Sequence, residues 1–248
     1  RLAKVGASSN SFDANGNQIA RGTDSLAYDF ENRLKQSTIA GVATQYQYDG
    51  VGNRFVKTRG GTTTRYVLDV NRTLPAVLAE MDAGGTVIAY NVYGLGLISR
   101  VLQDGSARYF HYDSRGSTTA LTDASGAVTD KYAYDPFGNF TNSQSTTPNP
   151  FRYVGRYGVM DEGNGLYFMR ARYYSAEAAV FLSTDRIRKI GPKWKPIAYA
   201  YADANPLKSL DPQGEWACPY FPNEGSCGPG HTQGEERDFS STQEFDQF

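Results

Sequence analysis

The stretch FRYVGRYGVMDEGNGLYFMRARYYSAEAAVFLSTD, from Phe151 to Asp185, crowds Tyr, Phe and Arg together with Gly at its breaks. From Leu166 to Tyr174, aromatic and apolar side chains alternate with Arg. This alternation predicts a β-strand with one face packed and the other face in contact with water. The stretch therefore indicates that the chain is built from sheet.

The composition of the whole chain agrees with a sheet protein. The 248 residues include Tyr 18, Phe 13 and Gly 26 but Met only 3, which favours strands joined by glycine turns over helices. A chain of this length can form one large all-β domain or two smaller ones, and it can bury a sizeable core. The net charge of −1 provides no basic field for a polyanion, so we expect no nucleic-acid partner. No apolar run approaches the ~20 residues of a membrane-spanning helix.

A short unit recurs along the chain: an aromatic residue followed by Asp, two variable positions, then Gly and Asn. The physical reason is that the aromatic ends a strand, Asp caps the turn through its side chain, and Gly or Asn takes the positive φ of a tight reversal. Three copies and two variants of the unit occur, at Phe12 to Asn17, Tyr48 to Asn53, Tyr134 to Asn139, Tyr28 to Arg33 and Tyr112 to Ser117.

Between these units, short alternating runs are separated by other Gly turns. The turns predicted from the sequence are Asn15-Gly16, Gly50 to Asn53, Gly84-Gly85, Asp104-Gly105 and Ser125-Gly126. The predicted strands include Thr62 to Leu68, Thr86 to Tyr93, Ser106 to Tyr112 and Val128 to Tyr134. We therefore expect successive antiparallel hairpins from Leu2 to Asp135, with a degenerate stretch from Arg65 to Gln103. An ordinary β-sandwich is the weaker alternative.

Pro150 to Gly214 resembles the Rhs repeat-associated core region, which closes the C-terminal end of Rhs and YD-repeat shells. The resemblance rests on the Arg-Tyr-Tyr run at Arg172 and on Asp211-Pro212-Gln213-Gly214. It implies an all-β fold: an antiparallel YD-repeat hairpin sheet, forming a coiled strip or partial shell, closed by an Rhs-core region. The expected domains are 1–141 for the repeat sheet, 142–150 for a linker, 151–214 for the core and 215–248 for a variable tail.

In many Rhs and toxin-complex proteins the resembled core is a self-cleaving aspartyl protease. The resemblance assigns the two carboxylates to Asp185 and Asp211 and the scissile bond to Glu215 and Trp216. The chemistry requires one carboxyl to be protonated and the other ionised around one peptide bond. A competing interpretation is that each Asp only caps a turn.

Several positions depart from the family pattern around this pair. Asp185 is followed by Arg186, Ile187 and Arg188 where the family has a Pro-x-Gly turn, and Val180 replaces an arginine of the family motif. Arg186 or Arg188 remains a source of cation, which would favour ionised Asp185. We therefore expect cleavage to be slow or absent.

The tail holds the chain's two cysteines, Cys218 and Cys227, within CPYFPNEGSC. A local disulfide is the leading interpretation if the compartment is oxidising. Free thiols, and then zinc with His231, are the alternatives, but the spacing matches no zinc pattern well, so we predict no metal site and no cofactor. The composition of the tail fits two alternatives equally well: an arm that binds a neighbouring molecule, and a disordered segment. The arm's anchors would be Phe239, Phe245 and Phe248.

The sequence leaves three classes of function in competition. They are a non-enzymatic encapsulating or surface-assembly sheet, an autoprotease that releases the segment after Glu215, and an adhesion protein whose sheet edges pair between copies. The first is preferred, with partners that are other copies of the chain or the rest of a larger Rhs shell, and with carbohydrate as an open class of ligand. The resemblance implies a bacterial protein that is secreted or at the cell surface. Because the chain opens on Arg1, we expect a processed or excised piece of a longer protein.

Overall fold

The computed structural model describes residues 4–5, 8–185, 198–215 and 218–219. Fifteen strands form one antiparallel sheet: β1 (Lys4–Val5), β2 (Ser8–Phe12), β3 (Gln18–Arg21), β4 (Asp24–Tyr28), β5 (Leu34–Ile39), β6 (Val42–Tyr48), β7 (Arg54–Arg59), β8 (Thr62–Asp69), β9 (Ala76–Met81), β10 (Val87–Tyr93), β11 (Leu97–Leu102), β12 (Ala107–Tyr112), β13 (Thr118–Thr122), β14 (Val128–Tyr134) and β15 (Phe140–Gln144). The second sheet comprises β16 (Met160–Asp161), β17 (Leu166–Met169), β18 (Arg172–Ser175) and β19 (Val180–Phe181). The remaining elements are β20 (Ser209–Leu210), β21 (Cys218–Pro219) and two 3-10 helices, η1 (Gly155–Tyr157) and η2 (Tyr201–Ala204).

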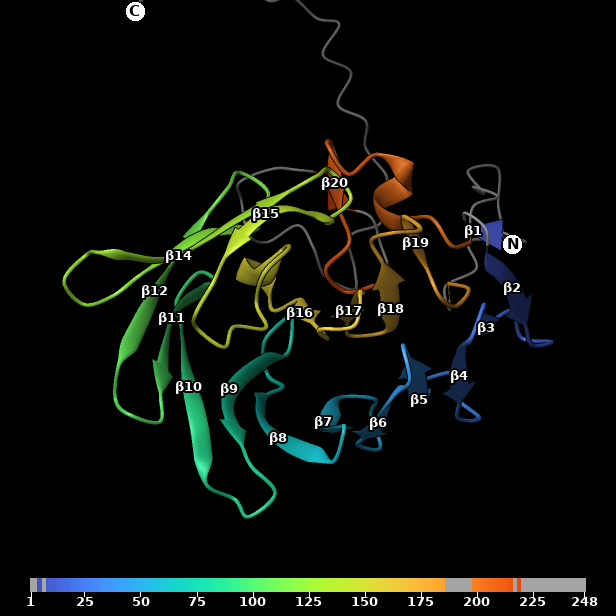
Figure 1. The fold of residues 1–248 in the computed structure, drawn as a ribbon, viewed down its shortest axis with the longest axis horizontal. Coiled ribbons are helices and arrows are strands. Elements are labelled where there is room, and N and C mark those ends of the chain that lie inside the picture. The colour runs from blue at the N-terminus through green and yellow to red at the C-terminus, as the bar shows by residue number, and fades with distance from the viewer. Residues whose placement is uncertain (1–3, 6–7, 186–197, 216–217, 220–248) are drawn as a thin grey trace, which may run out of the picture.

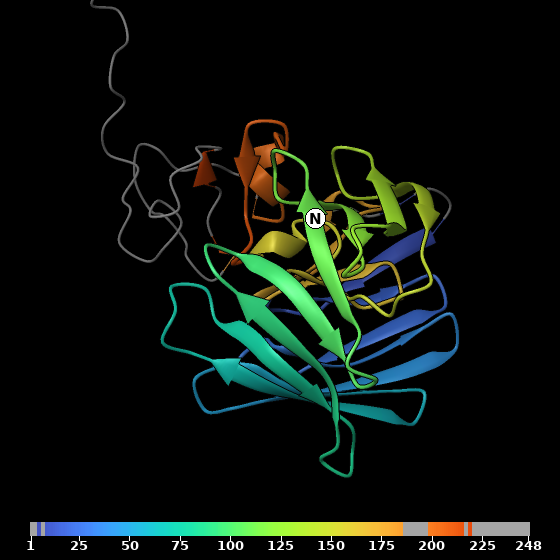
Figure 2. The same ribbon diagram turned by 90° about the vertical axis from the view of Figure 1, so that its left-hand side faces the viewer.

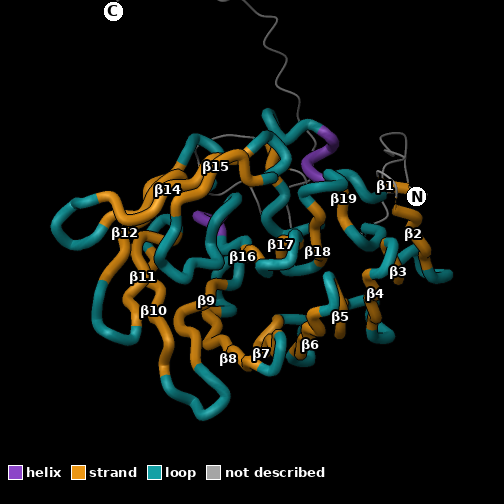
Figure 3. The backbone as a smooth tube through the Cα atoms, viewed as in Figure 1, coloured by secondary structure: helices purple, strands orange, loops and turns teal. Residues whose placement is uncertain are grey.

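The strands of the large sheet pair strictly in sequence order, and the described strands do not close into a barrel. We call this sheet the strip. In Figure 1 the strip curves from β1 around to β15, and β16 to β18 lie inside the curve. Figure 3 shows that, within the described part of the chain, helix is limited to the two short 3-10 turns. The prediction of an all-β, antiparallel hairpin sheet is confirmed.

The Asp-Gly turns form as the repeat unit predicts. At Asp49, the Oδ1 atom accepts hydrogen bonds from the amides of Val51 (3.0 Å) and Asn53 (2.8 Å), and Gly52 takes a φ of 95°. Asp135 makes the same bonds to Phe137 and Asn139. A glycine is favoured at the fourth position of the turn because a side chain is strained at that φ. The other predicted turns also reverse the chain, with positive φ at Gly16, Gly85, Gly105 and Gly126.

Successive turns of the strip fall at two opposite rims, because each strand reverses the direction of the one before it. The turns after β2, β4, β6, β8, β10, β12 and β14 make one rim, which we call the plug-side rim. All five aromatic-Asp units lie there. Leu68 and Tyr93 hold the equivalent places at the ends of β8 and β10, and both pack against the same core cluster as Tyr48 and Tyr112. The degenerate stretch is therefore continuous with the repeats on either side.

Residues 151–185 and 198–215, which we call the plug, complete the core. Strip side chains such as Leu34, Tyr66 and Leu121 form one buried cluster with Phe151 and Phe168 of the plug. A second cluster lies within the plug and includes Tyr153, Tyr174 and Tyr201. The inner face of the strip and the plug thus share one apolar core.

The prediction of one half-wet strand over Leu166 to Tyr174 is wrong. The segment is a hairpin of β17 and β18, reversed at Arg170 (φ 53°), and every residue in both strands is buried. Alternate residues of β17 pack into different clusters: Phe168 joins the strip cluster and Tyr167 joins the plug cluster. The hairpin is covered on both faces, so its alternation does not mark a solvent-exposed side.

Candidate functional site

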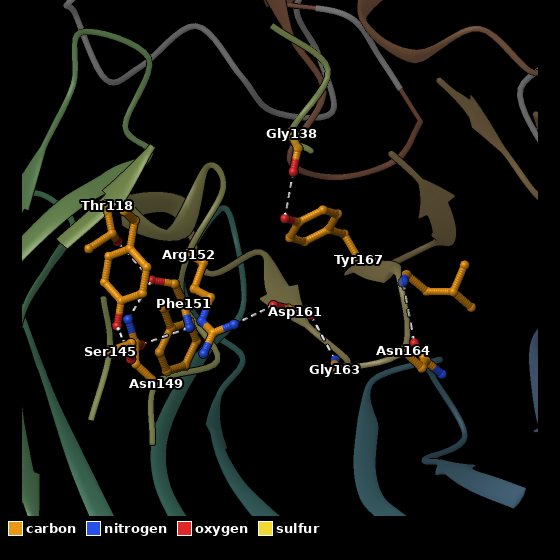
Figure 4. Close-up of polar contacts among 12 residues, drawn as sticks. Thr118, Gly138, Ser145, Asn149, Phe151, Arg152, Asp161, Gly163, Asn164 and Tyr167 are labelled. Atoms are coloured by element: carbon orange, nitrogen blue, oxygen red, sulfur yellow. Dashed lines mark hydrogen bonds and ion pairs between the residues drawn. The ribbon is translucent and has the colours of Figure 1, made fainter. Parts of the chain in front are cut away.

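The plug contacts the last turn of the plug-side rim through three tyrosines. The hydroxyls of Tyr153, Tyr174 and Tyr167 donate to the carbonyls of Pro136, Phe137 and Gly138, each at 2.8 Å. Figure 4 shows the Tyr167 contact. Burial raises the pKa of Tyr153 to about 12, so its hydroxyl stays protonated as a donor. These bonds are to backbone atoms, so they depend on the shape of the turn.

The neighbouring turn, from Asp113 to Ser117, is held by the start of the plug around η1. The amide of Arg156 donates to the Gly116 carbonyl at 3.0 Å, and the amide of Val154 donates to the Ser117 hydroxyl at 3.1 Å. The Thr118 amide in turn donates to the Arg152 carbonyl at 2.9 Å. Plug and rim are therefore joined in both directions by backbone hydrogen bonds.

Further turns are contacted by the rest of the plug. Tyr199 donates to the Gly16 carbonyl at 2.7 Å, which ties the first aromatic-Asp turn to a late segment of the chain. Partly buried Arg170 donates to the carbonyl of Pro75, before β9, at 2.9 Å and to the carbonyl of Pro212 at 2.8 Å. Burial lowers the pKa of Arg170 to about 10, which leaves it charged at neutral pH. The plug thus spans the rim from its first turn to its last.

Two rim glycines leave space that the plug fills. A Cβ added at Gly138 would lie 2.7 Å from the ring of Tyr153, and one at Gly116 would lie 2.6 Å from the ring of Tyr157. Glycines of the opposite rim, such as Gly105 and Gly126, have nothing within 4 Å of an added Cβ. At these two positions glycine therefore serves close approach as well as turn geometry, whereas Gly52 on the same rim has nothing within 4 Å of an added Cβ.

A buried ion pair anchors the plug to the inner face of the strip. Arg54 Nη1 of β7 lies 2.7 Å from Glu162 Oε1, both side chains are fully buried, and Lys57 Nζ lies 3.3 Å from the other oxygen. Burial alone would raise the pKa of Glu162, but the charges of Arg54 and Lys57 hold it below its ordinary value. The Arg54 guanidinium also covers the ring of Phe168, with 3.8 Å from Cζ to the ring centroid. This pair is a fully buried, charged link between strip and plug.

The chain between strip and plug is fixed by Asp130. Its carboxylate accepts hydrogen bonds from the Thr146 amide at 2.7 Å and from the Thr147 amide and hydroxyl at 2.9 and 2.6 Å. Farther along, Asn149 Oδ1 accepts from the Phe151 amide at 2.9 Å, as Figure 4 shows. The segment predicted as a linker is therefore held along the last strands, and β15 extends into its start.

The structure brings Asp185 and Asp211 to one guanidinium. Arg172 Nη2 lies 3.4 Å from Asp185 Oδ2 and 3.4 Å from Asp211 Oδ2. Arg172 and Asp211 are buried, and the Arg172 guanidinium also covers the ring of Phe181 at 3.7 Å. Burial lowers the pKa of Arg172, while Asp211 and Asp185 oppose that shift. The cation at this site therefore comes from β18; Arg186 and Arg188 lie outside the described residues.

Asp211 also holds the backbone that leads to the candidate scissile bond. Its Oδ1 accepts from the amides of Gly214 at 2.7 Å and Glu215 at 3.0 Å, while Arg172 Nε donates to the Gly214 carbonyl. Both oxygens of Asp211 thus accept hydrogen bonds, Oδ1 from the turn amides and Oδ2 from Arg172. Trp216, on the far side of the candidate bond, lies outside the described residues.

Two functional contacts were missed from the sequence. Arg172 was recognised only as part of the Arg-Tyr-Tyr run, and its contact with both aspartates depends on how β18 lies between them. Glu162 and Arg54 carried no signal beyond their charge. Cys227 lies outside the described residues, so its pairing with Cys218 stays a prediction. Among the described residues there is no group of three or more His, Cys, Asp or Glu that could hold a metal ion.

A coiled strip of antiparallel hairpins, covered at one rim by its own C-terminal plug, defines a YD-repeat shell protein of the Rhs type. The chain belongs to the teneurin YD-shell family, whose model matches residues 1–206. The described part of the chain has no helix long and apolar enough to cross a membrane.

The relatives and a similar structure agree with this assignment. The chain is 36% identical over 225 residues to the tRNA3(Ser)-specific nuclease WapA of Bacillus spizizenii, covering 87% of this chain but 9% of that protein. It is 28% identical to toxin protein Tse5 of Pseudomonas aeruginosa, covering 86% of this chain and 19% of Tse5. The crystal structure of TcdB2-TccC3-Cdc42 superposes with a TM-score of 0.64 at 22% identity, over 82% of this chain and 11% of that one. A relative named as a tRNA nuclease leaves our exclusion of nucleic-acid partners without support.

Proposed function

We propose that this chain is the closing segment of a β-shell, in which the strip forms part of the shell wall and the plug seals one rim of the strip. The function is structural and encapsulating, and the parent is a secreted toxin-related protein. The proposed units are 1–141 as the wall, 142–150 as the connection, 151–214 as the plug and 215–248 as the variable tail. This chain spans 9% of the WapA relative, so most of the wall would come from elsewhere in a longer polypeptide.

The observation that carries the proposal is the set of plug contacts along the plug-side rim. Tyr199 at the first turn, Arg170 near the middle and Tyr153 at the last turn all donate to turn carbonyls. A segment that merely followed the strip would not need to meet turns so far apart in the sequence. Contact along the whole rim favours a closing role over an adhesive one.

The experiment is to nick the chain between strip and plug. A site-specific protease sequence inserted between Gln144 and Ser145 allows cleavage after folding. We expect the two pieces to co-elute in native size-exclusion chromatography and to separate only in denaturant, because they share one buried core and the Arg54 to Glu162 ion pair. Separation into a folded strip and a free plug under native conditions would contradict a sealing role.

Autoproteolysis is the second candidate function, favoured by the convergence of Asp185 and Asp211 on Arg172. Against it, Asp211 already accepts hydrogen bonds from two backbone amides and from Arg172, which supports its role as a turn cap. An error of ~1 Å in the aim of a catalytic group can cost about a hundredfold in rate. We therefore expect cleavage between Glu215 and Trp216 to be slow or absent.

The test is the intact mass of the purified chain beside that of an Asp211→Asn variant. The expected result is that both chains remain full length over the purification. Complete conversion of the unmodified chain to a Glu215 terminus, with the variant intact, would restore the autoprotease as the function. This outcome and the nicking experiment are independent, because a cleaved tail leaves the strip and plug joined.

A further inference from the structure

The sequence contains two Asn-Gly pairs, Asn15-Gly16 and Asn164-Gly165. At such a pair the glycine nitrogen can attack the side-chain carbonyl carbon of the asparagine, because glycine has no side chain to hinder the approach. A bond from the nitrogen to Cγ forms, the bond from Cγ to Nδ2 breaks, and ammonia leaves with the proton of the glycine amide. Water then opens the cyclic imide at either carbonyl, which gives aspartate or isoaspartate. The two pairs can therefore be compared by what holds the reacting atoms.

The reacting nitrogens of the pair at Asn164 make no hydrogen bonds. This pair lies in the loop between β16 and β17 of the plug. Among the described residues, nothing accepts a hydrogen bond from the Gly165 amide. Asn164 Nδ2 is buried and also has no partner within the described part of the chain. The attacking nitrogen and the departing ammonia are therefore both unrestrained.

The oxygen of the Asn164 side chain is held in a way that favours the attack. Asn164 Oδ1 accepts from the Leu166 amide at 3.3 Å, and Figure 4 shows this bond. As in an Asx turn, the bond directs the side chain along the Gly165 peptide that follows it. The Leu166 amide is also a donor to the atom on which negative charge develops as nitrogen adds to Cγ. Gly163 and Gly165 are exposed, so water reaches the loop for the second step.

The same atoms of the other pair are engaged in hydrogen bonds. The Gly16 amide donates to the Asp13 carbonyl at 3.1 Å, and Asn15 Nδ2 donates to Asn32 Oδ1 at 2.9 Å. Both bonds must break before the Gly16 nitrogen can attack and ammonia can leave. Asn15 is exposed whereas Asn164 is half-buried, so exposure alone would predict the opposite order of reactivity.

We propose that Asn164 is a site of spontaneous deamidation, with water as the co-reactant, and that this modification loosens the plug. The two preceding residues contact the strip: Glu162 pairs with Arg54 at 2.7 Å, and the Gly163 carbonyl accepts from Arg59 Nη2 at 2.8 Å. Isoaspartate adds a methylene to the main chain directly after these contacts, and either product adds a negative charge two residues from Glu162. This inference goes beyond the proposed function, because it concerns the covalent structure of the loop.

The test follows both Asn-Gly pairs of the whole chain during incubation in mildly alkaline buffer. Mass spectrometry after digestion measures the gain of one mass unit at each pair, and a parallel incubation in urea gives the rates without the fold. In the folded chain we expect Asn164 to react about tenfold or more faster than Asn15, because two hydrogen bonds must break first at Asn15. In urea this difference disappears. Asn164→Gln abolishes the gain at its own site, and the matched control Asn15→Gln leaves the rate at Asn164 unchanged.

Equal rates at the two pairs of the folded chain, or a faster reaction at Asn15, would overturn the assignment of this site. So would an Asn164 that stays intact in the folded chain while it reacts in urea.

The effect on the plug is measured on modified chain that has been isolated by ion exchange through its added charge. In urea unfolding followed by circular dichroism, we expect a lower midpoint for this material than for the unmodified chain. Asn164→Gln incubated for the same time keeps its own midpoint. A modified chain with an unchanged midpoint would contradict the loosening of the plug.

Discussion

Replacing Gly138 with alanine should lower the free energy of unfolding more than replacing Gly126, because only Gly138 faces the plug. Both glycines are the fourth residue of an Asp-x-x-Gly turn, with φ of 95° and 85°, and both donate to the Asp carbonyl, at 3.1 and 3.0 Å. An L-residue in the left-handed region costs about 1–2 kcal/mol, which is common to both variants. At Gly138 the new Cβ would also lie 2.7 Å from the ring of buried Tyr153.

Displacing that ring costs a further 1–3 kcal/mol or so, the usual range for overpacking a core. We therefore expect Gly126→Ala to lose about 1–2 kcal/mol of unfolding free energy and Gly138→Ala about 2–5 kcal/mol. Urea unfolding followed by circular dichroism measures both. Equal losses in the two variants would refute the claim that the plug is seated against this turn.

Three other predictions concern the ion pair, the cleavage site and the tail. Arg54→Met leaves buried Glu162 with Lys57 as its nearest cation, and we expect a loss of about 3–5 kcal/mol in urea unfolding; a loss below about 1 kcal/mol would mean the pair contributes little. The pKa of Glu162 in the folded chain is held below its ordinary value of 4.5. Ionised Glu162 therefore contributes to the free energy of unfolding above pH 4.5, and this contribution is lost as the pH falls through the folded pKa. The loss of unfolding free energy caused by Arg54→Met should accordingly shrink in acid. At the cleavage site, we expect little of the chain to acquire a Glu215 terminus on prolonged incubation, because Asp211 is held as a turn cap by the amides of Gly214 and Glu215; steady accumulation of that terminus would count against this. A disulfide joining Cys218 and Cys227 predicts a mass two hydrogens lighter without reductant, and two alkylated thiols in fresh material would exclude it.

The turns of the strip were predictable because their chemistry is local. Asp49, Gly52 and Asn53 lie within one turn, so a short motif specifies both the hydrogen bonds and the positive φ. The turns after β8 and β10 escaped the same search, because Leu68 replaces the aromatic residue and Gly94 replaces Asp. Their positions follow only from the alternation of rims along a meander.

The plug was harder to predict because its contacts join distant parts of the chain. Arg54 meets Glu162 across 108 residues, and Tyr199 meets Gly16 across 183. Neither pair is marked by spacing or periodicity. The role of Arg172 was missed for a related reason: the family motif directed attention to Val180, whereas the side chain that reaches both aspartates starts from β18.

Native-state hydrogen exchange of the unmodified chain tests most directly whether strip and plug are one structure. Peptides from β17 and β18 in the plug and from β12 to β14 in the strip are compared by mass spectrometry. Because both sets pack into the same buried cluster, we predict that their slowest amides exchange with the same free energy of opening. Plug amides that exchange through a separate opening of lower free energy, while the strip stays protected, would contradict the account.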